Sequence, residues 1–375
     1  MNVVVSGAVA NRVHNAGEAW VRASWIESFI ELGHDVSFVE CLDTTTADPP
    51  LDPAAQRAVD WFDLVVGWFG LADRSHLVVG AEPTEPVREL LARADVLVDI
   101  SGTLPASWIE LVGGERVYVD LDPGFTHVWA ERGLIDLSRH DRHATVGLRI
   151  GSPDCVVPTG GLDWIAVRQP VILDRWPVGP VPVEPFRCTT VASWRPSYGP
   201  LEWAGVHHGV KVHEFRRHLT LPGETLAQME LALAIDPADA ADRTSLSDAN
   251  WVLTEAALPS ASPMAFRDYV TESSAEWSVA QGAYVGLGTG WFSDRTVRYL
   301  AAGRPAIVQE TGWSRQLPSG MGLLPFDSVE SAARAIAHVM DDPHAHGAAA
   351  RAIAEDWFGP GQALAPLLNT LGVPV

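Results

Sequence analysis

A glycine-rich stretch in the last quarter of the chain carries residue types that bind phosphate. It runs from Gly286 to Gly312, and Ser293-Asp294-Arg295-Thr296 stands where a helix is predicted to begin. Glycine lets a backbone approach a ligand closely, and the first turn of a helix offers unpaired N–H groups with a partial positive charge. The pattern therefore predicts a binding loop for a phosphate-bearing ligand, with an ordinary strand-to-helix turn as the alternative.

A second candidate site follows the first predicted strand. The loop over residues 7–17 contains His14, with Asn11 and Asn15 beside it, directly before a predicted helix. Histidine exchanges protons near neutral pH and is the usual general base, so His14 is a candidate catalytic residue. A capping or solvated loop histidine is the alternative. The loop is longer than the GxGxxG dinucleotide fingerprint and lacks it, which disfavours a dehydrogenase.

Two aspartates follow another predicted strand, in the order Asp120-Leu121-Asp122-Pro123-Gly124. Carboxylates at the carboxyl end of a parallel strand are candidates for catalysis or for sugar binding. The Asp-x-Asp spacing would also suit a Mg²⁺ or Mn²⁺ ion, whereas the Pro-Gly pair indicates an ordinary turn. We expect no bound metal here.

Composition narrows the class of protein. The chain has 375 residues, 47% apolar and 19% charged, which suits two ordinary globular domains. A net charge of −21 argues against binding nucleic acid or an anionic membrane surface. The cysteines Cys41, Cys155 and Cys188 fit neither a disulfide framework nor a zinc cluster, which favours a reducing compartment. Without a basic leader or a long apolar run, the predicted location is the cytoplasm.

Hydrophobic patterning predicts two α/β units of similar size. Residues 171–187 are too rich in proline for a helix or a central strand and are predicted to be a linker. The predicted domains are residues 1–170 and 188–358, and residues 359–375 form a C-terminal helix that packs back on the first domain. The expected fold class is α/β, with two Rossmann-like domains facing a central cleft.

The elements of each unit are predicted from apolar runs and helical spacing. In the first unit the predicted strands are 2–6, 35–40, 64–67, 96–100, 116–120 and 146–150, and a helix covers 18–32. In the second unit the predicted strands are 188–192, 231–235, 283–285 and 306–308. A helix over 265–279 is predicted to carry Glu276 on its surface.

Two stretches resemble the bacterial group 1 glycosyltransferases. The segment WFSDRTVRYLAAGRP, from Trp291 to Pro305, is similar to their donor-site helix, which ends in a Gly-x-Pro turn before a strand and a second loop. The N-terminal SGAVANRVHNAGEAW, with LGHDVSFVE after the helix, is similar to their acceptor-side unit. The resemblance covers both ends of the chain and the middle only loosely. It implies a GT-B fold, a nucleoside diphosphate sugar as substrate, and neither an essential metal nor a cofactor.

The resemblance also implies roles for individual residues. His14 falls where inverting members place a catalytic histidine, and Asp120 or Asp122 would orient it or serve instead. Arg195 and Lys211 would bind the diphosphate. The remaining donor-side residues are Gly290, Ser293, Asp294, Arg295, Thr296, Thr311 and Gly312. The acceptor-side loop contributes Gly7, Asn11, Asn15 and Gly17.

The chain departs from the family at a pair of glutamates that many retaining members carry around the donor-site helix. Gly290 and Arg298 stand at those positions, so retaining chemistry is unsupported. The predicted function is a metal-independent glycosyltransferase with an unidentified acceptor, such as a natural product or a cell-surface glycan. The alternatives are a sugar-nucleotide epimerase of the same architecture and a non-catalytic protein that binds nucleotide sugars.

Overall fold

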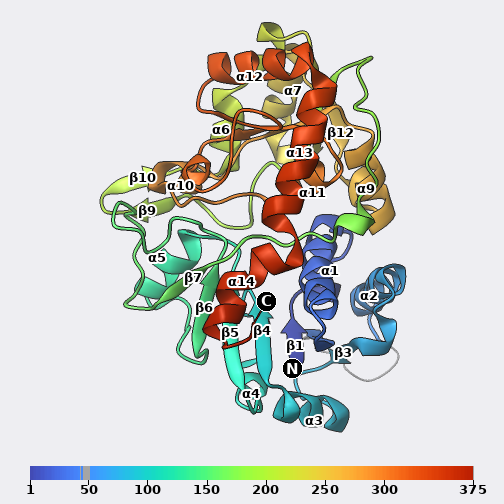
Figure 1. The fold of residues 1–375 in the computed structure, drawn as a ribbon, viewed down its shortest axis with the longest axis vertical. Helices are drawn as coiled ribbons and strands as arrows, with labels where there is room; N and C mark the ends of the chain where they lie inside the picture. The colour runs from blue at the N-terminus through green and yellow to red at the C-terminus, as the bar shows by residue number, and fades with distance from the viewer. Residues whose placement is uncertain (43, 45–50, 375) are drawn as a thin grey trace.

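Two parallel sheets, one in each half of the chain, form the framework of the computed structural model (Figure 1). The structure describes residues 1–42, 44 and 51–374, so residue 375, the last of the predicted C-terminal segment, lies outside the described residues. In spatial order the strands of the first sheet are β3 (Ser75–Val79), β2 (Asp35–Leu42), β1 (Asn2–Ser6), β4 (Val96–Ile100), β5 (Glu115–Asp120), β6 (Arg142–Thr145) and β7 (Trp164–Ala166).

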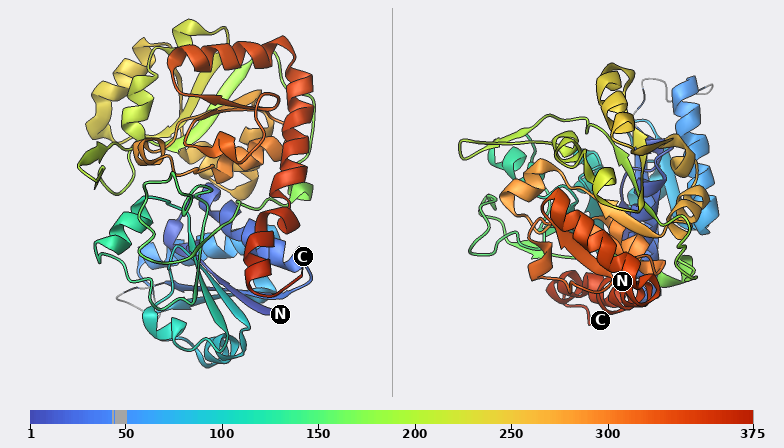
Figure 2. Two further views of the ribbon diagram at one scale, coloured as in Figure 1. Left: turned by 60° about the vertical axis from the view of Figure 1, so that its left-hand side comes forward. Right: turned by 90° about the horizontal axis from the view of Figure 1, so that it is seen from above.

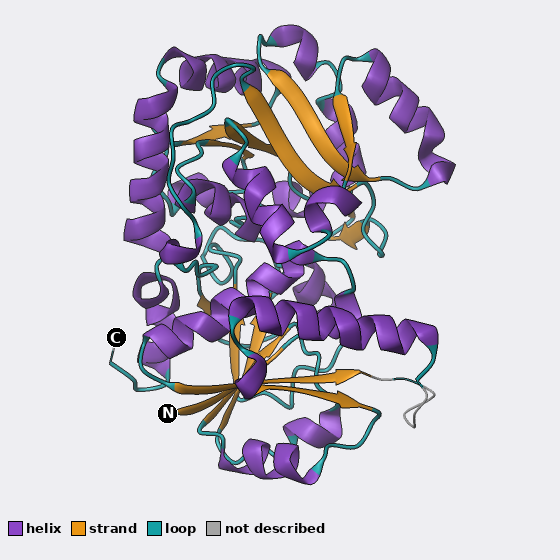
Figure 3. Cartoon of the chain, turned by 90° about the vertical axis from the view of Figure 1, so that its right-hand side faces the viewer, coloured by secondary structure: helices purple, strands orange, loops and turns teal. Residues whose placement is uncertain are grey.

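Helices cover both faces of this first sheet, as the cartoon in Figure 3 shows. They are α1 (Ala16–Glu31), α2 (Pro53–Phe69), α3 (Glu85–Arg93), α4 (Ala106–Ile109) and α5 (Phe125–Glu131). Burial on both faces explains why β4 reads as a nearly continuous apolar run, with all five residues buried.

The second sheet repeats the arrangement with six parallel strands. In spatial order they are β12 (Val252–Glu255), β11 (Gln228–Ala234), β8 (Arg187–Ser193), β13 (Ala275–Ser278), β14 (Ala306–Gln309) and β15 (Leu323–Phe326). The helices around it are α6 (Lys211–Arg217), α7 (Ala240–Asp248), α8 (Ala257–Ser260), α9 (Pro263–Thr271), α10 (Gly282–Leu287), α11 (Asp294–Ala301), α12 (Val329–Asp341) and α13 (Pro343–Phe358). A separate antiparallel hairpin pairs β9 (Leu201–Trp203) with β10 (Val206–His208).

The chain passes between the halves twice. It first crosses between β7 and β8, and it returns at the end of α13, which leads into α14 (Pro360–Thr370). Helix α14 lies beside the first sheet, in contact with α1 and β7 (Figure 2). The backbone N–H of Val171 donates to the carbonyl of Phe358 at 2.9 Å, so the two crossing segments are bonded to each other.

Two predicted strands are wrong because they belong to helices. Residues 64–67 lie inside α2, whose buried residues recur at helical spacing from Ala58 through Phe62 and Val65 to Phe69. Residues 283–285 lie inside α10. A short apolar run does not by itself distinguish a strand from a buried helical turn.

Two further predictions are wrong because long-range contacts decide the local structure. The helix predicted over 265–279 ends at Thr271, since Ala275 and Glu276 pair with β8 and form strand β13. Glu276 is therefore buried in a sheet and not on a helix surface. The strand predicted over 146–150 lies after β6, and its apolar side chains pack where the two halves meet. Tertiary pairing overrides local preference at both places.

The fold class, two Rossmann-like α/β units, is confirmed by the two parallel sheets and their helices. Within the described ranges, no helix is both long and apolar enough to cross a membrane.

Replacing one leucine of α14 tests how much this helix stabilises the fold. Leu367 is fully buried, so Leu367→Ala should lower the free energy of unfolding by about 2–5 kcal/mol through lost burial and a cavity. Leu226→Ala is the matched control, because Leu226 is 95% exposed and its loss should change stability by less than about 0.5 kcal/mol. Urea unfolding followed by tryptophan fluorescence measures both, and equal shifts of the two midpoints would contradict the packing described.

Candidate active site

A cavity of about 630 Å³ lies between the two halves and receives residues from both. The first half contributes the loop between β1 and α1, together with Asp122 after β5. The second half contributes the segments that follow β8, β11, β12 and β13, and the first turn of α11. The carboxyl ends of parallel strands in both sheets therefore meet at one site, which is where open α/β sheets bind ligands.

The loop after β1 forms the first-half face of the cavity. His14, Asn15 and Gly17 line it, and the Asn15 side chain caps α1 by accepting from the Glu18 N–H at 3.2 Å. His14 has a left-handed backbone, φ 57°, and its ring meets the edge of the Trp61 ring at a centroid distance of 5.4 Å. The imidazole is thus exposed to the cavity with its orientation restricted by a neighbouring ring.

Gly7 and Asn11 belong to this loop but are not among the residues that line the cavity. A Cβ atom at Gly7 would lie 2.8 Å from Cγ of Arg22, so glycine at this position makes room for a buried arginine. The Asn11 amide donates to Glu40 at 2.8 Å and to the carbonyl of Cys41 at 2.9 Å. Both residues therefore fix the conformation of the loop through contacts on the side away from the cavity.

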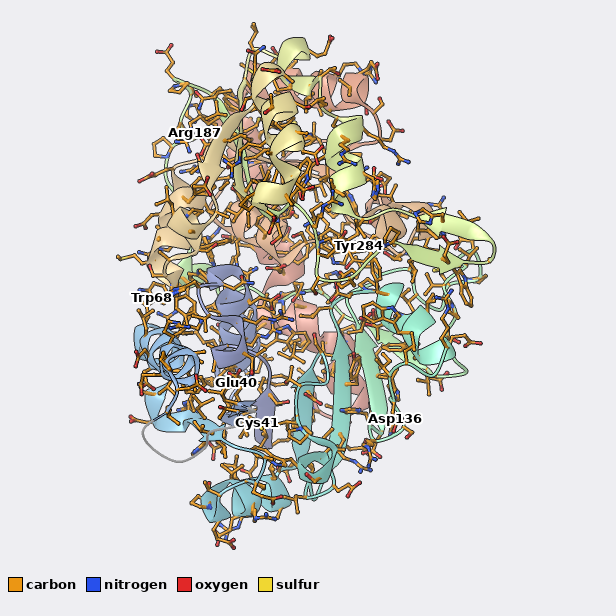
Figure 4. All side chains as sticks on the ribbon, turned by 180° about the vertical axis from the view of Figure 1, so that it is seen from behind. Glu40, Cys41, Trp68, Asp136, Arg187 and Tyr284 are labelled. Atoms are coloured by element: carbon orange, nitrogen blue, oxygen red, sulfur yellow. The ribbon has the colours of Figure 1, made fainter. Side chains whose placement is uncertain are left out.

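Asp122 lines the cavity and is held by tyrosines of the other half. Its Oδ1 accepts from the hydroxyl of Tyr284 at 2.5 Å and from that of Tyr198 at 3.2 Å. Figure 4 shows Tyr284 at the junction of the two halves. Burial is the main cause that raises the pKa of the Asp122 carboxyl, and the tyrosine hydroxyls act in the opposite direction.

Asp120 lies behind Asp122 and is fully buried. It accepts from the Thr145 hydroxyl at 2.7 Å and from the Asp122 N–H at 2.9 Å, and burial raises its pKa to about 6. The two carboxylates are therefore engaged by different protein donors. Among the residues that the structure describes, no group of three His, Cys, Asp or Glu side chains is placed to hold a metal ion.

Lys211 is the only lysine of the sequence and lines the second-half face of the cavity. Its backbone N–H donates to Oε1 of Gln281, another lining residue, at 2.6 Å. Burial, and after it the positive charge of Arg295, lowers the pKa of Lys211 to about 8. The ammonium group therefore carries a positive charge at neutral pH and loses it in mildly alkaline solution.

Arg295 lies beside Lys211 in the cavity wall and is fixed from behind. Its guanidinium donates to Glu276 at 2.7 Å, to the carbonyl of Val191 at 2.9 Å and to the Ser278 hydroxyl at 2.5 Å. Glu276 is fully buried, so this is an ion pair shielded from water on the carboxylate side. These three acceptors fix the orientation of the Arg295 guanidinium at the cavity.

The start of α11 follows the sequence prediction closely. The Ser293 hydroxyl caps the helix by accepting from the Arg295 N–H at 3.2 Å. Asp294 lines the cavity and accepts from the buried Arg298 at 2.7 Å, while Thr296 is buried inside. Of these residues, Asp294 and Arg295 face the cavity, and the others support the turn.

The glycines of the predicted donor loop lie against a protein side chain. A Cβ atom at Gly290 would lie 2.8 Å from the backbone nitrogen of Arg149, and one at Gly312 would lie 2.6 Å from its Cδ. Arg149 comes from the first half and donates to the carbonyl of Gly288 at 2.8 Å. Thr311 is buried beside this contact, and its hydroxyl donates to the Trp291 carbonyl at 2.7 Å.

Arg195 is not brought to the cavity with the other predicted phosphate ligand. Its guanidinium pairs with both carboxylate oxygens of Asp239, at 2.7 and 2.8 Å, and its side chain is 47% exposed. The residues around Arg195 that do line the cavity are Ser193, Pro196, Ser197 and Tyr198. Lys211 and Arg295 are therefore the cationic pair on the second-half face.

Several residues that shape the site were missed by sequence reasoning. Glu40 and Glu276 each lie in a short apolar run, and a carboxylate within a buried strand signals a need for nearby donors. The roles of Tyr198 and Tyr284 had no local signal, because each tyrosine meets an aspartate from the other half of the chain.

Comparison with known proteins shows the fold. No protein-family model matches the sequence, and no curated protein matches it. Among solved structures, an α-glucosyltransferase in complex with UDP-glucose and DNA containing an abasic site matches with a TM-score of 0.61 at 9% identity, over 99% of this chain and 98% of that chain. HepE of Anabaena, in complex with UDP-glucose, matches with a TM-score of 0.58 at 10% identity, over 99% of both chains.

A sucrose-phosphate synthase from Thermosynechococcus elongatus matches with a TM-score of 0.52 at 11% identity, over 99% of this chain and 98% of that chain. At such identities the likeness concerns the fold, and it extends over both halves of the chain. The chain therefore has the GT-B fold, with the cavity in the cleft between its two domains.

Two matched glycine substitutions test whether Gly290 is constrained by Arg149. Gly290 and Gly133 have similar φ angles, 73° and 69°, but a Cβ atom at Gly133 would meet nothing within 4 Å. Gly133→Ala should therefore cost only the backbone strain, about 1–2 kcal/mol. Gly290→Ala should cost a further 1–3 kcal/mol or so, because a backbone atom of Arg149 blocks the methyl group.

Denaturant unfolding measures both costs, and titration with UDP measures the affinity of each folded variant. Equal losses of stability for Gly290→Ala and Gly133→Ala would refute the packing constraint. A loss of UDP affinity confined to Gly290→Ala, without extra destabilisation, would instead indicate that this glycine approaches the ligand.

Proposed function

We propose that the chain is a glycosyltransferase that moves a sugar from a nucleoside diphosphate donor to an acceptor hydroxyl. The observation that carries the proposal is the shared cavity, in which His14 and Asp122 lie on one face and Lys211 and Arg295 on the other. A UDP-sugar is the first donor to test, because the neighbours of the same fold bind UDP or UDP-glucose. The acceptor belongs to the class of natural products or cell-surface glycans.

The proposed reaction assigns one role to each face. His14 takes the proton of the acceptor hydroxyl, and the acceptor oxygen forms a bond to C1 of the sugar. The bond from C1 to the diphosphate oxygen breaks, and the nucleoside diphosphate leaves with the electron pair. Lys211, Arg295 and the N–H groups at the start of α11 stabilise the negative charge that the leaving group gains. Asp122 assists on the acceptor side.

We propose that the transfer needs no metal ion. A cationic pair on the second-half face supplies the charge that a divalent ion would supply in a metal-dependent transferase. The site of Asp120 and Asp122 suits a metal poorly, because threonine and tyrosine hydroxyls already donate to these carboxylates. Rates that stay unchanged in EDTA are the expected result.

Two other functions would use the same cavity. A sugar-nucleotide epimerase would convert a UDP-sugar in the absence of any acceptor, and a non-catalytic binding protein would hold it unchanged. A nucleic acid acceptor, as in the DNA complexes of the α-glucosyltransferase, is disfavoured here by the net charge of −21. We favour the transferase because a candidate base and a cationic pair line one cavity from opposite domains.

Donor turnover tests the proposal directly. The protein should release UDP slowly from UDP-glucose in water alone, and His14→Ala should lower this rate by about 10²-fold or more while leaving UDP affinity unchanged. Nucleotide release is measured by chromatography, and the sugar product is identified by NMR. A new UDP-sugar formed without acceptor would support the epimerase. The absence of binding to UDP, GDP, dTDP and ADP would overturn all three functions.

The pH dependence of UDP binding tests the role of Lys211. Since its pKa is lowered to about 8, the ammonium is protonated below that pH, and the charge is lost as pH rises through it. UDP affinity should therefore fall by up to about tenfold between pH 7 and pH 9. Lys211→Arg should bind UDP without this pH dependence, because a guanidinium stays protonated. Calorimetry at constant ionic strength measures both, and a flat wild-type profile would refute the assignment.

A further inference from the structure

Glu40 is a buried carboxylate that the proposed reaction does not use. It lies near the end of β2, beside β1, with only 2% of its surface exposed (Figure 4). A carboxylate removed from water is costly unless donors surround it. Among the residues that the structure describes, the hydrogen-bond donors to Glu40 all belong to the loop that carries His14.

Both carboxylate oxygens of Glu40 are used. Oε2 accepts from the backbone N–H groups of Val9 and Ala10, each at 2.9 Å. Oε1 accepts from the Asn11 backbone N–H at 2.9 Å and from the Asn11 side-chain amide at 2.8 Å. Four donors from three successive residues therefore converge on one side chain, which fixes the path of the chain after β1.

A buried arginine completes this arrangement. Arg22 of α1 is 4% exposed and forms an ion pair with Glu18. Burial lowers the pKa of its guanidinium to about 10, and the negative charge of Glu40 acts in the opposite direction. The absence of a side chain at Gly7 leaves room for the stem of Arg22, which a Cβ atom there would meet at 2.8 Å. Two ionisable side chains, Glu40 and Arg22, are thus buried at the base of the loop, and burial raises the pKa of the Glu40 carboxyl while the loop donors act in the opposite direction.

Backbone hydrogen bonds connect the residues that Glu40 binds to the turn that contains His14. Residues 10–12 form a single 3₁₀ turn, in which Arg12 N–H donates to the Val9 carbonyl at 3.0 Å. The Asn15 N–H then donates to the Arg12 carbonyl at 3.1 Å, which places His14 in the left-handed region at φ 57°. Such a backbone costs about 1–2 kcal/mol for a residue with a side chain and persists only where its surroundings enforce it.

We propose that Glu40 is the positioning residue of the active site: it anchors the loop over residues 9–11 and thereby holds His14 at the cavity. The kinetic part of this inference rests on the proposed function, in which His14 is the base. A purely structural acid would stabilise the whole domain and affect every property of the protein alike. A positioning residue acts through His14 and leaves donor binding by the second domain intact.

Glu40→Gln is the informative substitution, because it keeps the size of the side chain. The NH₂ group of glutamine would replace one carboxylate oxygen and would face the two N–H donors that this oxygen accepts from. Two of the four hydrogen bonds to the loop would therefore be lost, and the N–H groups would repel each other. The turnover of UDP-glucose should fall by about 10²-fold in kcat with KM for the donor unchanged, since a shift of about 1 Å at a catalytic group has that effect. Glu40→Asp keeps both acceptors and should recover part of the loss.

The double variant with His14→Ala separates positioning from general stability. If Glu40 acts through His14, adding Glu40→Gln to His14→Ala should lower kcat no further, whereas independent effects would multiply. Glu27→Gln is the matched control, because Glu27 is a mostly buried acid of α1 paired with Arg175 on another surface. It should lower the unfolding midpoint and leave the turnover unchanged.

A measurement without turnover tests the anchor itself. Hydrogen exchange should show faster exchange of the Val9, Ala10 and Asn11 amides in Glu40→Gln, while the strand amides of β1 stay protected. Unchanged exchange, or an unchanged kcat in a variant that binds UDP normally, would overturn the inference. If wild type neither binds UDP nor consumes UDP-glucose, the proposed function fails, and the exchange result still decides whether Glu40 anchors the loop.

Discussion

The side chain of Arg149 joins the two domains whose residues line the shared cavity. It leaves the first domain and enters the glycine-rich turn of the second, where it donates to the carbonyl of Gly288. The backbone around it also crosses the interface, since the Arg149 N–H donates to the Thr289 carbonyl and Gly147 pairs with Trp291. These contacts between residues 147–149 and 288–291 join the two domains on one side of the cleft. Residues from both domains can therefore line one cavity.

Acidic side chains in and behind the cavity wall follow a common rule: each accepts hydrogen bonds from residues outside its own strand or loop. Glu40 accepts from three loop N–H groups and the Asn11 amide, one oxygen of Glu276 accepts from Arg295, and one oxygen of Asp122 accepts from two tyrosine hydroxyls. A buried charge without such partners would neutralise or destabilise the fold. The cost of burial is thus offset by contacts that also fix geometry, which is what a site needs when it must meet a transition state without reorganising.

The sequence predicts the elements whose signals are local. The apolar run of β4 and the Ser293 cap of α11 both lie where the sequence indicates them. Of the predicted site residues, His14, Asp122, Lys211 and Arg295 line one cavity.

What sequence reasoning could not predict depends on partners far along the chain. The sequence around Arg195 does not indicate an ion-pair partner, because the carboxylate of Asp239 lies 44 residues further along the chain. The glycines after residue 286 suggested a ligand, whereas the group that approaches them comes from a position 139 residues earlier. The strand β13 likewise exists because β8 pairs with it, and no local pattern carries that information.

The single lysine of the chain lies on the second-half face of the cavity. Lysine and arginine together number 26, so 25 positions hold arginine and only position 211 holds lysine. An arginine there would remain protonated at every physiological pH and would present a rigid planar fork. A lysine presents a compact charge whose pKa burial can lower, here to about 8. In a chain with 25 arginines the cavity holds the single lysine, so the charge of this wall depends on pH near the pKa of Lys211, whereas an arginine at the same position would keep its charge.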